Sequence, residues 1–358
     1  MNMTFDGERV RAGPEARERF YDARGYGRPR DGDIELAPVE VAHLLFRGDV
    51  DEVRDGRPDA AADDRLDFDS FLASVAVSEV DFFVYKELRD RGFYLSPSRT
   101  EMSSDFVVYP RGDGPWDDTV AYHVTVLSER ETVTASTLTR IANCPDDAGE
   151  RENPTGVLAV VDEESEVTYL ELDQPTLTGS TYHELPSVDG RLLSDRVLVA
   201  DPPTALHDHA FYGQRLDRDD DPVQLSLVEA AYLAGESLLA LDGGAHDGHG
   251  RIVARGRAVE GERFDRRLRV YSALRTAGIV PKTGFKFGAD FRTYAHVESV
   301  DNLGHSEFLV RVLPREHSFV PRDLALDVRL AHGVRKRMVF ALADEDGIDL
   351  LSVQRLTP

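Results

Sequence analysis

Apolar residues fall at helical spacing in the second half of the chain and predict two amphipathic helices. The first is followed by Gly278, a residue that suits a helix C-terminus. Its apolar face consists of Phe264, Leu268, Tyr271 and Leu274. The second begins at Pro321, since proline is favoured in the first turn of a helix. Its apolar face consists of Leu324, Val328 and Ala331.

Short apolar runs predict strands in both halves of the chain. In the first half the predicted strands are 119–127, 157–161 and 166–172, and in the second they are 306–313, 338–343 and 348–354. Short helices are expected upstream, at 37–47 and 226–240. Mixed strands with flanking helices indicate an α/β (α+β mixed) fold.

The same order of elements appears twice because the chain contains two related sequences. Three pairs of stretches match at similar offsets, 186, 185 and 189 residues, as surface insertions would cause. They are DFFVYKELRDRGFYL (81–95) with RLRVYSALRTAGIVP (267–281), SSDFVVY (103–109) with GADFRTY (288–294), and PVEVAHLL (38–45) with LVEAAYLA (227–234). Their shared order predicts a tandem duplicated repeat, in which each copy has a small N-terminal α/β subdomain and a mixed-sheet subdomain flanked by helices.

The duplication predicts where the domains lie. The first repeat is expected at 1–172, and a stretch rich in Pro, Gly and Ser at 173–190 is the expected linker. The second repeat then divides into an N-terminal subdomain at 191–262 and a mixed-sheet domain at 263–358.

Charge adds information about the surroundings of the protein. The formal net charge is −24, from 66 acidic and 42 basic residues, and lysine occurs only at 86, 282, 286 and 336. An acidic surface spread along the whole chain suits concentrated salt, where charges are screened within about 3 Å at 1 M. The alternative is an acidic protein in ordinary salt that avoids polyanions. Under the first interpretation, only local basic clusters are informative about partners.

Several classes of protein are excluded. Cys144 is the one cysteine, so neither an internal disulfide framework nor a cysteine-rich zinc site is expected. No apolar stretch approaches the ~18 residues of a membrane span, and the N-terminal sequence has no signal-peptide core. We therefore expect a soluble cytoplasmic protein.

The two copies differ in their reactive side chains. The second copy contains Tyr294, His305 and Lys336, the last within the basic triplet of GVRKRMVFAL (333–342). The first copy keeps Tyr109 opposite Tyr294, but has Thr119 opposite His305 and no lysine before its matching strand. The histidine and the lysine precede neighbouring predicted strands, where reactive groups gather on a rigid scaffold.

A tyrosine, a histidine and a lysine suit attack of an RNA 2′-hydroxyl on its own phosphodiester. That reaction needs a base, an acid for the leaving 5′-oxygen, and a cation for the phosphorane oxygens. Lysine supplies a compact charge without a metal, and histidine exchanges protons near neutrality. The structural alternatives are a packed tyrosine, an exposed loop histidine, and a basic triplet at a helix C-terminus.

The stretches GFKFGADFRTY, GHSEFLVRVL and VRLAHGVRKRMVFAL resemble those of archaeal tRNA-splicing endonucleases of the two-repeat, homodimeric type. The resemblance implies Tyr294 as general base, His305 as general acid and Lys336 as transition-state stabiliser. It further implies a degenerate first repeat and cleavage of precursor tRNA at bulge–helix–bulge sites. The products would carry 2′,3′-cyclic phosphate and 5′-hydroxyl ends, and no metal or other cofactor would be needed.

The resemblance also implies binding residues. Arg329 and Arg355 correspond to two arginines that sandwich a bulged base, a recognised mode of RNA binding. The acidic stretch 145–152 corresponds to a loop that enters a basic pocket of the partner subunit. Two cuts, one at each bulge, suit two identical sites in a homodimer.

Two rival interpretations remain. A metal-dependent nuclease would need clustered carboxylates, whereas Asp290 stands alone in its strand; HDH (207–209) and HDGH (246–249) could bind zinc as a pair, or be exposed loop histidines. The other rival is a non-catalytic RNA-binding or assembly subunit.

Overall fold

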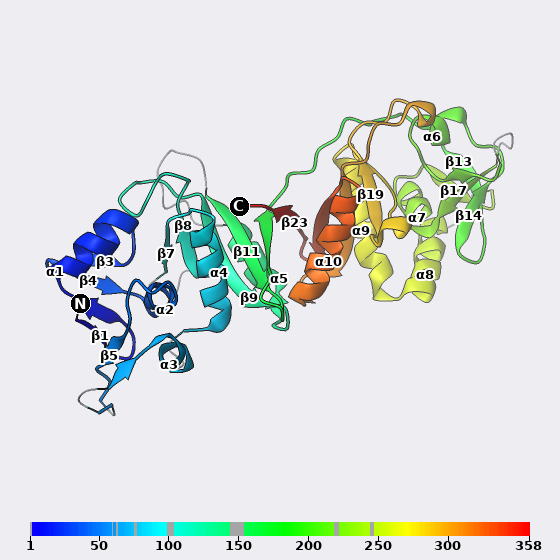
Figure 1. Ribbon diagram of the computed structural model, residues 1–358. Coiled ribbons are helices and arrows are strands. Elements are labelled where there is room, and N and C mark those ends of the chain that lie inside the picture. Colours follow the sequence, from blue (N-terminus) through cyan, green and yellow to red (C-terminus); the bar gives the residue numbers. More distant parts are fainter. Residues whose placement is uncertain are drawn as a thin grey trace. The chain divides into compact units, whose positions relative to one another are not determined.

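The chain forms two compact units (Figure 1). The computed structural model describes residues 2–58, 60–61, 64–74, 77–98, 104–143, 154–217, 222–243 and 247–358. Unit 1 contains Met1–Asp173, Ser318–Ala325 and Arg355–Pro358, and unit 2 contains Gln174–His317 and Leu326–Gln354.

Unit 1 begins with a small sheet in the order β3-β4-β2-β1-β5-β6. Its strands are β1 (Met3–Phe5), β2 (Val10–Ala12), β3 (Arg28–Arg30), β4 (Asp33–Leu36), β5 (Val53–Asp55) and β6 (Arg65–Leu66). Its helical segments are α1 (Pro14–Ala16), the π-helical η1 (Arg17–Asp22), α2 (Pro38–Phe46) and α3 (Phe68–Ala73). The fully buried rings of Phe5, Phe20 and Phe71 fill the core of this subdomain.

The second part of unit 1 is a mixed sheet in the order β7-β8-β9-β11-β12. β9 and β11 are parallel, whereas the other neighbours are antiparallel. Helix α4 packs against β9 and β11, and α5 packs against β11 and β12 (Figure 1). The elements are α4 (Glu79–Asp90), β7 (Leu95–Pro97), β8 (Phe106–Val108), β9 (Tyr122–Ser128), α5 (Ala135–Ala142), β11 (Thr155–Val161) and β12 (Val167–Asp173). A short antiparallel pair joins β10 (Val133–Thr134) to β21 (Ser318–Phe319).

Unit 2 also begins with a small sheet, in the order β15-β16-β14-β13-β17. Its strands are β13 (Val188–Leu192), β14 (Arg196–Val199), β15 (Gln214–Arg215), β16 (Val223–Ser226) and β17 (Leu239–Leu241). Its helices are α6 (Thr204–Asp208), α7 (Leu227–Gly235) and α8 (Gly248–Glu260). Ser226 and Glu229 form a capping box that fixes the start of α7.

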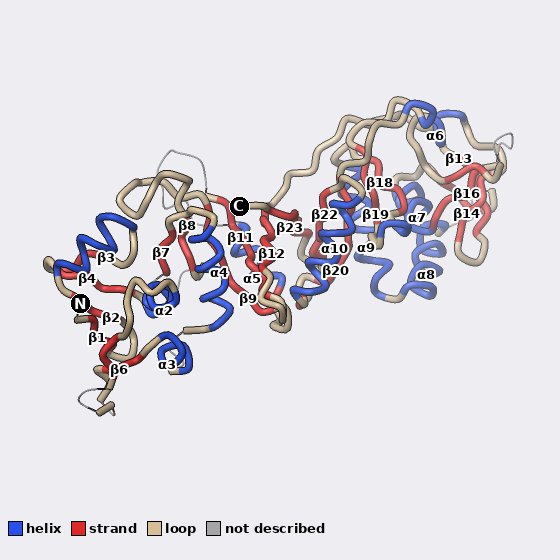
Figure 2. Tube along the Cα trace, in the orientation of Figure 1, coloured by secondary structure: helices blue, strands red, loops and turns tan. Residues whose placement is uncertain are grey.

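The second part of unit 2 is a mixed sheet in the order β18-β19-β20-β22-β23, and α9 packs against β18, β20 and β22 (Figure 2). β20 and β22 are parallel, and the other neighbours are antiparallel, as in unit 1. The elements are α9 (Glu262–Thr276), β18 (Val280–Thr283), η2 (Phe285–Phe287), β19 (Phe291–Tyr294), η3 (Val300–Asn302), β20 (Phe308–Pro314), α10 (Pro321–Gly333), β22 (Arg337–Ala343) and β23 (Ile348–Leu356). The prediction of a tandem α/β duplication is confirmed.

One predicted element is wrong at its end. The helix expected at 226–240 stops at Gly235, and Leu239–Leu241 forms strand β17. The break follows from Ser237, whose φ of 61° is left-handed, so the chain leaves the helix and pairs with β13.

The stretch between β12 and β13 is held against unit 2 along part of its length. Gly179 and Thr181 donate backbone hydrogen bonds to Ala277 and Gly278, and the Ser180 amide donates to Ala295. Glycine is needed at 179 because a Cβ there would lie 2.3 Å from the carbonyl oxygen of Gly278.

Candidate active site

Tyr294 is the last residue of β19, which pairs with β18 and β20. Successive side chains of a strand point to opposite faces, so Arg292 and Tyr294 share a face while Phe291 turns toward α9. The Tyr294 ring is 6 % exposed and packs against Phe211, with 5.8 Å between the ring centroids. Its hydroxyl makes no hydrogen bond with any described residue.

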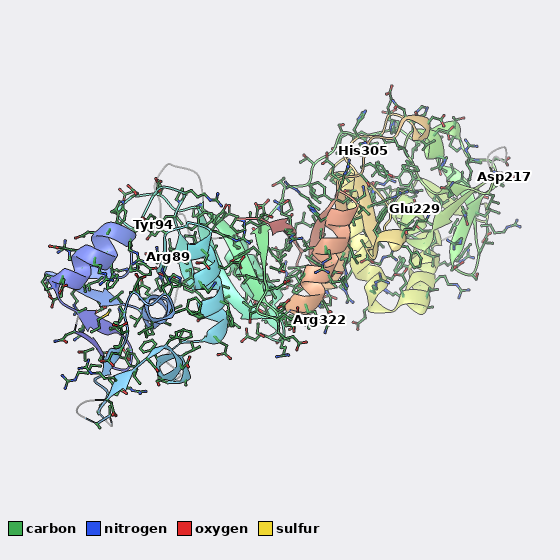
Figure 3. All side chains as sticks on the ribbon, in the orientation of Figure 1. Arg89, Tyr94, Asp217, Glu229, His305 and Arg322 are labelled. Carbon is green, nitrogen blue, oxygen red and sulfur yellow. The ribbon has the colours of Figure 1, made fainter. Side chains whose placement is uncertain are left out.

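His305 lies on the exposed loop that precedes β20 (Figure 3). The next residue, Ser306, is buried, and Glu307 accepts a hydrogen bond of 3.0 Å from the amide of Arg337. The loop is therefore fastened to the start of β22, although the imidazole itself is open to solvent.

Lys336 lies in the turn between α10 and β22. The helix ends when Arg335 adopts a left-handed φ of 57°, which lets the amide of Lys336 bond back to Ala331. The Lys336 ammonium donates a hydrogen bond of 2.5 Å to the carbonyl oxygen of Ser306. Burial, and next the charge of Arg292, lower the pKa of the Lys336 ammonium.

These contacts bring three predicted residues to the ends of neighbouring strands. β19, β20 and β22 are adjacent, and Tyr294 ends β19 at the edge where β20 and β22 begin. The Lys336 ammonium bonds to the backbone carbonyl oxygen of Ser306, the residue that follows His305. We call Tyr294, His305 and Lys336 the strand-end site.

The two predicted binding arginines have different settings. Arg329 is exposed on α10, seven residues before Lys336, and makes no ion pair with a described residue. Arg355 is in β23 but belongs to the Arg355–Pro358 segment of unit 1. The two arginines therefore belong to different units.

Sheet register identifies the matching positions in the first repeat. Val124 pairs with Val157 as Val310 pairs with Val339. Counting back along these strands puts Thr119 opposite His305 and Pro154 opposite Lys336. The first repeat therefore keeps Tyr109 but has neither the imidazole nor the ammonium.

Comparison with known proteins reveals the family of this chain. The family domain described as "tRNA intron endonuclease, catalytic C-terminal domain" matches this chain twice, at residues 79–169 and 264–350. The N-terminal domain of the same family also matches twice, at 1–63 and 188–246. The chain belongs to the tRNA intron endonuclease family. The match to a catalytic domain identifies it as an enzyme, and the alternation of the two domains agrees with a tandem repeat.

The tRNA intron endonuclease family is represented by relatives over the full length of the chain. A tRNA-splicing endonuclease of Haloarcula marismortui is 58 % identical over 365 residues and covers 100 % of both chains. One from Natronomonas pharaonis is 54 % identical and covers 98 % of this chain and 97 % of the relative. One from Methanosarcina acetivorans is 37 % identical over 99 % of both chains. Haloarchaeal relatives agree with the archaeal, salt-adapted interpretation of the charge.

Beside the site lies a buried ion pair that sequence reasoning missed. Lys282 on β18 donates hydrogen bonds to the carbonyl oxygens of Phe211 and Gly213 and, at 2.9 Å, to Glu229 (labelled in Figure 3). Burial lowers the pKa of Lys282; burial also opposes ionisation of Glu229, but the lysine outweighs it and holds that pKa at about 2. The hydrogen bond from Lys282 holds the backbone of Phe211, which has a left-handed φ of 54°. The Phe211 ring in turn packs against the Tyr294 ring.

A signal for Lys282 exists in the sequence, because it is a retained lysine in a chain that uses arginine almost everywhere. An ammonium donates three hydrogen bonds in different directions, which a planar guanidinium cannot reproduce. The other missed residue, Arg292, stands two positions before Tyr294, where the first repeat has Val107.

The remaining expectations have mixed outcomes. Residues 145–152 and His246 lie outside the described residues. His207 and His209 each place Nδ1 near a backbone carbonyl oxygen, of Tyr212 and Glu298, respectively. No cluster of three potential metal ligands occurs among the residues that the structure describes. Within the same ranges, no helix has the length and apolar character of a membrane span.

Proposed function

We propose that this enzyme removes introns from precursor tRNA by cutting at bulge–helix–bulge sites. Family membership supports tRNA intron cleavage. The observation that carries the chemistry is the strand-end site, where Tyr294, His305 and Lys336 gather in the second repeat alone. The same strand ends of the first repeat carry Tyr109, Thr119 and Pro154.

In the proposed reaction, the 2′-oxygen of the nucleotide before the cut attacks its own phosphorus. Tyr294 accepts the 2′-hydroxyl proton as general base, and a protonated His305 gives its proton to the departing 5′-oxygen. The products are a 2′,3′-cyclic phosphate and a 5′-hydroxyl, with no water consumed in the step. Lys336 stabilises the charge that develops on the non-bridging oxygens.

The proposal needs no metal because the lysine supplies the positive charge. Its ammonium is held by the Ser306 carbonyl, so the charge is positioned before the substrate arrives. In this proposal residues 263–358 form the catalytic domain, residues 191–262 support it, and repeat 1–172 is degenerate.

We assign substrate binding to two exposed arginines, Arg329 on helix α10 and Arg355 on strand β23, which would stack on an unpaired base. A cytoplasmic homodimer would place one strand-end site at each bulge of the precursor. A stretch of unstacked bases is more accessible to stacking than a continuous duplex, which favours bulges as the target.

The experiment is cleavage of three RNAs of equal length in EDTA: one with the bulge–helix–bulge, one with a single bulge, and one with a continuous duplex. We expect efficient cleavage of the first alone. Binding without cleavage under any ionic condition would identify a non-catalytic RNA-binding or assembly subunit instead. Cleavage only after Mg²⁺ is restored would contradict the metal-independent reaction.

A further inference from the structure

Arg292 occupies a position from which it can reach the same substrate as Lys336. It lies on β19, paired with Lys282 of β18, two residues before Tyr294 and on the same face. Its guanidinium carbon is 5.6 Å from the centroid of the Tyr294 ring. The cation therefore lies within the strand-end site rather than on a remote surface.

This arginine has no anionic partner among the described residues. Its Nε is shielded from solvent and makes no hydrogen bond, and no ion pair or other hydrogen bond of its side chain occurs within those ranges. Nearby arginines are paired: Arg267 with Asp290, and Arg311 with Asp327. Unlike the exposed Arg329 and Arg191, Arg292 is half-buried beside Tyr294, so its unpaired charge would be stabilised by an anion from outside the protein.

The surroundings of Arg292 strengthen this argument. Its charge acts on two ammonium groups, Lys336 and Lys282, and only Lys282 has a carboxylate beside it. Two like charges without a counterion repel each other, and an anion placed between them removes that cost. The first repeat, which lacks the histidine and the lysine, has the uncharged Val107 at the matching register position, opposite Ser96.

We propose that Arg292 binds a backbone phosphate of the RNA in the strand-end site, alongside Lys336. The assignment rests on the proposed function and adds a residue to it. A guanidinium presents parallel N–H groups to two phosphate oxygens, which holds the phosphate in one orientation. Arg292 thus orients the phosphate, and Lys336 stabilises the negative charge that develops on its oxygens during attack.

The test uses single-turnover cleavage of the bulge–helix–bulge RNA by Arg292→Val, the residue of the first repeat, and by Arg292→Lys. We expect Arg292→Val to be slower by about 10²-fold, the loss typical of removing one preorganised donor. Arg292→Lys keeps the charge but not the fork, so an intermediate rate is expected. Arg191→Val is the matched control, since Arg191 is an exposed arginine of strand β13.

A binding measurement distinguishes contact of Arg292 with a phosphate from a role of Arg292 in supporting the Tyr294 ring. It uses an RNA with a single 2′-deoxy nucleotide at the cut, which the proposed reaction cannot cleave. The slope of log affinity against log salt should fall by about 0.7–0.9 in Arg292→Val, as for one lost phosphate contact. An unchanged slope would overturn the inference. If the valine variant does not fold, Arg292→Gln replaces it with the same expectations.

Lys336→Ala in the same assay distinguishes the two proposals. A severe loss in Lys336→Ala with a normal rate in Arg292→Val refutes the role of Arg292 and leaves the proposed function intact. Normal rates in both variants refute the strand-end site itself.

Discussion

The two repeats share an internal framework but differ at their strand ends. In the first, Arg89 donates hydrogen bonds to the Tyr85 hydroxyl and to the carbonyl oxygens of Arg24 and Gly25. Its guanidinium lies over the ring of Tyr26. The second repeat has the matching arrangement: Arg275 bonds Tyr271 and the Ala210 carbonyl over the Tyr212 ring. In both repeats a glutamate, Glu40 or Glu229, accepts a hydrogen bond from a glycine amide. The framework that joins helix to subdomain is therefore independent of the chemistry.

The tyrosines at the strand ends show what the difference means. Tyr109 donates its hydroxyl to Ser96 at 3.1 Å, so this group is occupied. The residue matching Ser96 is Lys282, which points to Glu229 and leaves the Tyr294 hydroxyl without a described partner. A retained tyrosine is therefore no evidence of a retained site; its hydrogen-bond partners decide whether the hydroxyl is available.

Replacing the reactive side chains of the second repeat should give the largest effect. His305→Thr, which copies Thr119, and Lys336→Ala should each slow cleavage by about 10²–10⁴-fold, the range for one positioned acid or base. Single-turnover rates on the bulge–helix–bulge RNA measure this, with melting curves to verify folding. Thr119→Ala is the matched change in the first repeat, and a comparable loss there would contradict the division of roles.

Breaking the buried ion pair should be next in size. Lys282→Met leaves the Glu229 carboxylate buried without its partner, which should cost about 3–5 kcal/mol of unfolding free energy. Denaturant titration measures the loss. Ser96→Ala, the matched change in repeat 1, removes one neutral hydrogen bond and should cost only about 1 kcal/mol. A loss for Lys282→Met of only about 1 kcal/mol, as expected for Ser96→Ala, would mean that the second repeat does not depend on the ion pair.

A third contrast concerns the aspartate directly before the strand that leads to each tyrosine. Asp105 and Asp290 each accept a bond from the amide of the next strand, Val126 and Val312, respectively. Asp290 also forms an ion pair with Arg267. The residue of the first repeat that matches Arg267 is Asp81, so Asp105 has a carboxylate where Asp290 has a guanidinium. Burial, followed by the charges of Asp105 and Glu131, raises the pKa of Asp81 to about 7.

This contrast predicts a small effect of pH on stability. The folded protein keeps the proton on Asp81 up to about pH 7, whereas the unfolded chain loses it near pH 4, so the free energy of unfolding falls as the pH rises from about 4 to 7. Asp81→Asn should weaken this pH dependence, although Asp105, whose pKa burial also raises, still contributes. The variant should gain about 1–2 kcal/mol at pH 8, after allowance for screening. Denaturant titrations at pH 5 and pH 8 measure it; the same pH slope in both proteins would refute the assignment.

The sequence predicted much of this architecture because apolar spacing is a local signal and the duplication is visible when the two halves of the chain are compared. α9, α10 and six strands of the mixed sheets lie where their patterns placed them; the strands are β9, β11, β12, β20, β22 and β23. The Lys282–Glu229 pair could not be predicted, since it joins residues 53 apart through burial that no local pattern reports. Arg292 also escaped notice, because its meaning depends on the absence of a nearby carboxylate, a property of packing.

The most direct test of the central claim is the chemistry of the cut ends. The enzyme should be incubated in EDTA with two bulge–helix–bulge RNAs, one natural and one with a single 2′-deoxy nucleotide before each cut, and the products analysed by mass spectrometry. The account predicts 2′,3′-cyclic phosphate and 5′-hydroxyl ends from the natural RNA and no cleavage of the 2′-deoxy RNA. Ends with a 3′-hydroxyl and a 5′-phosphate, or cleavage of the 2′-deoxy RNA, would contradict it.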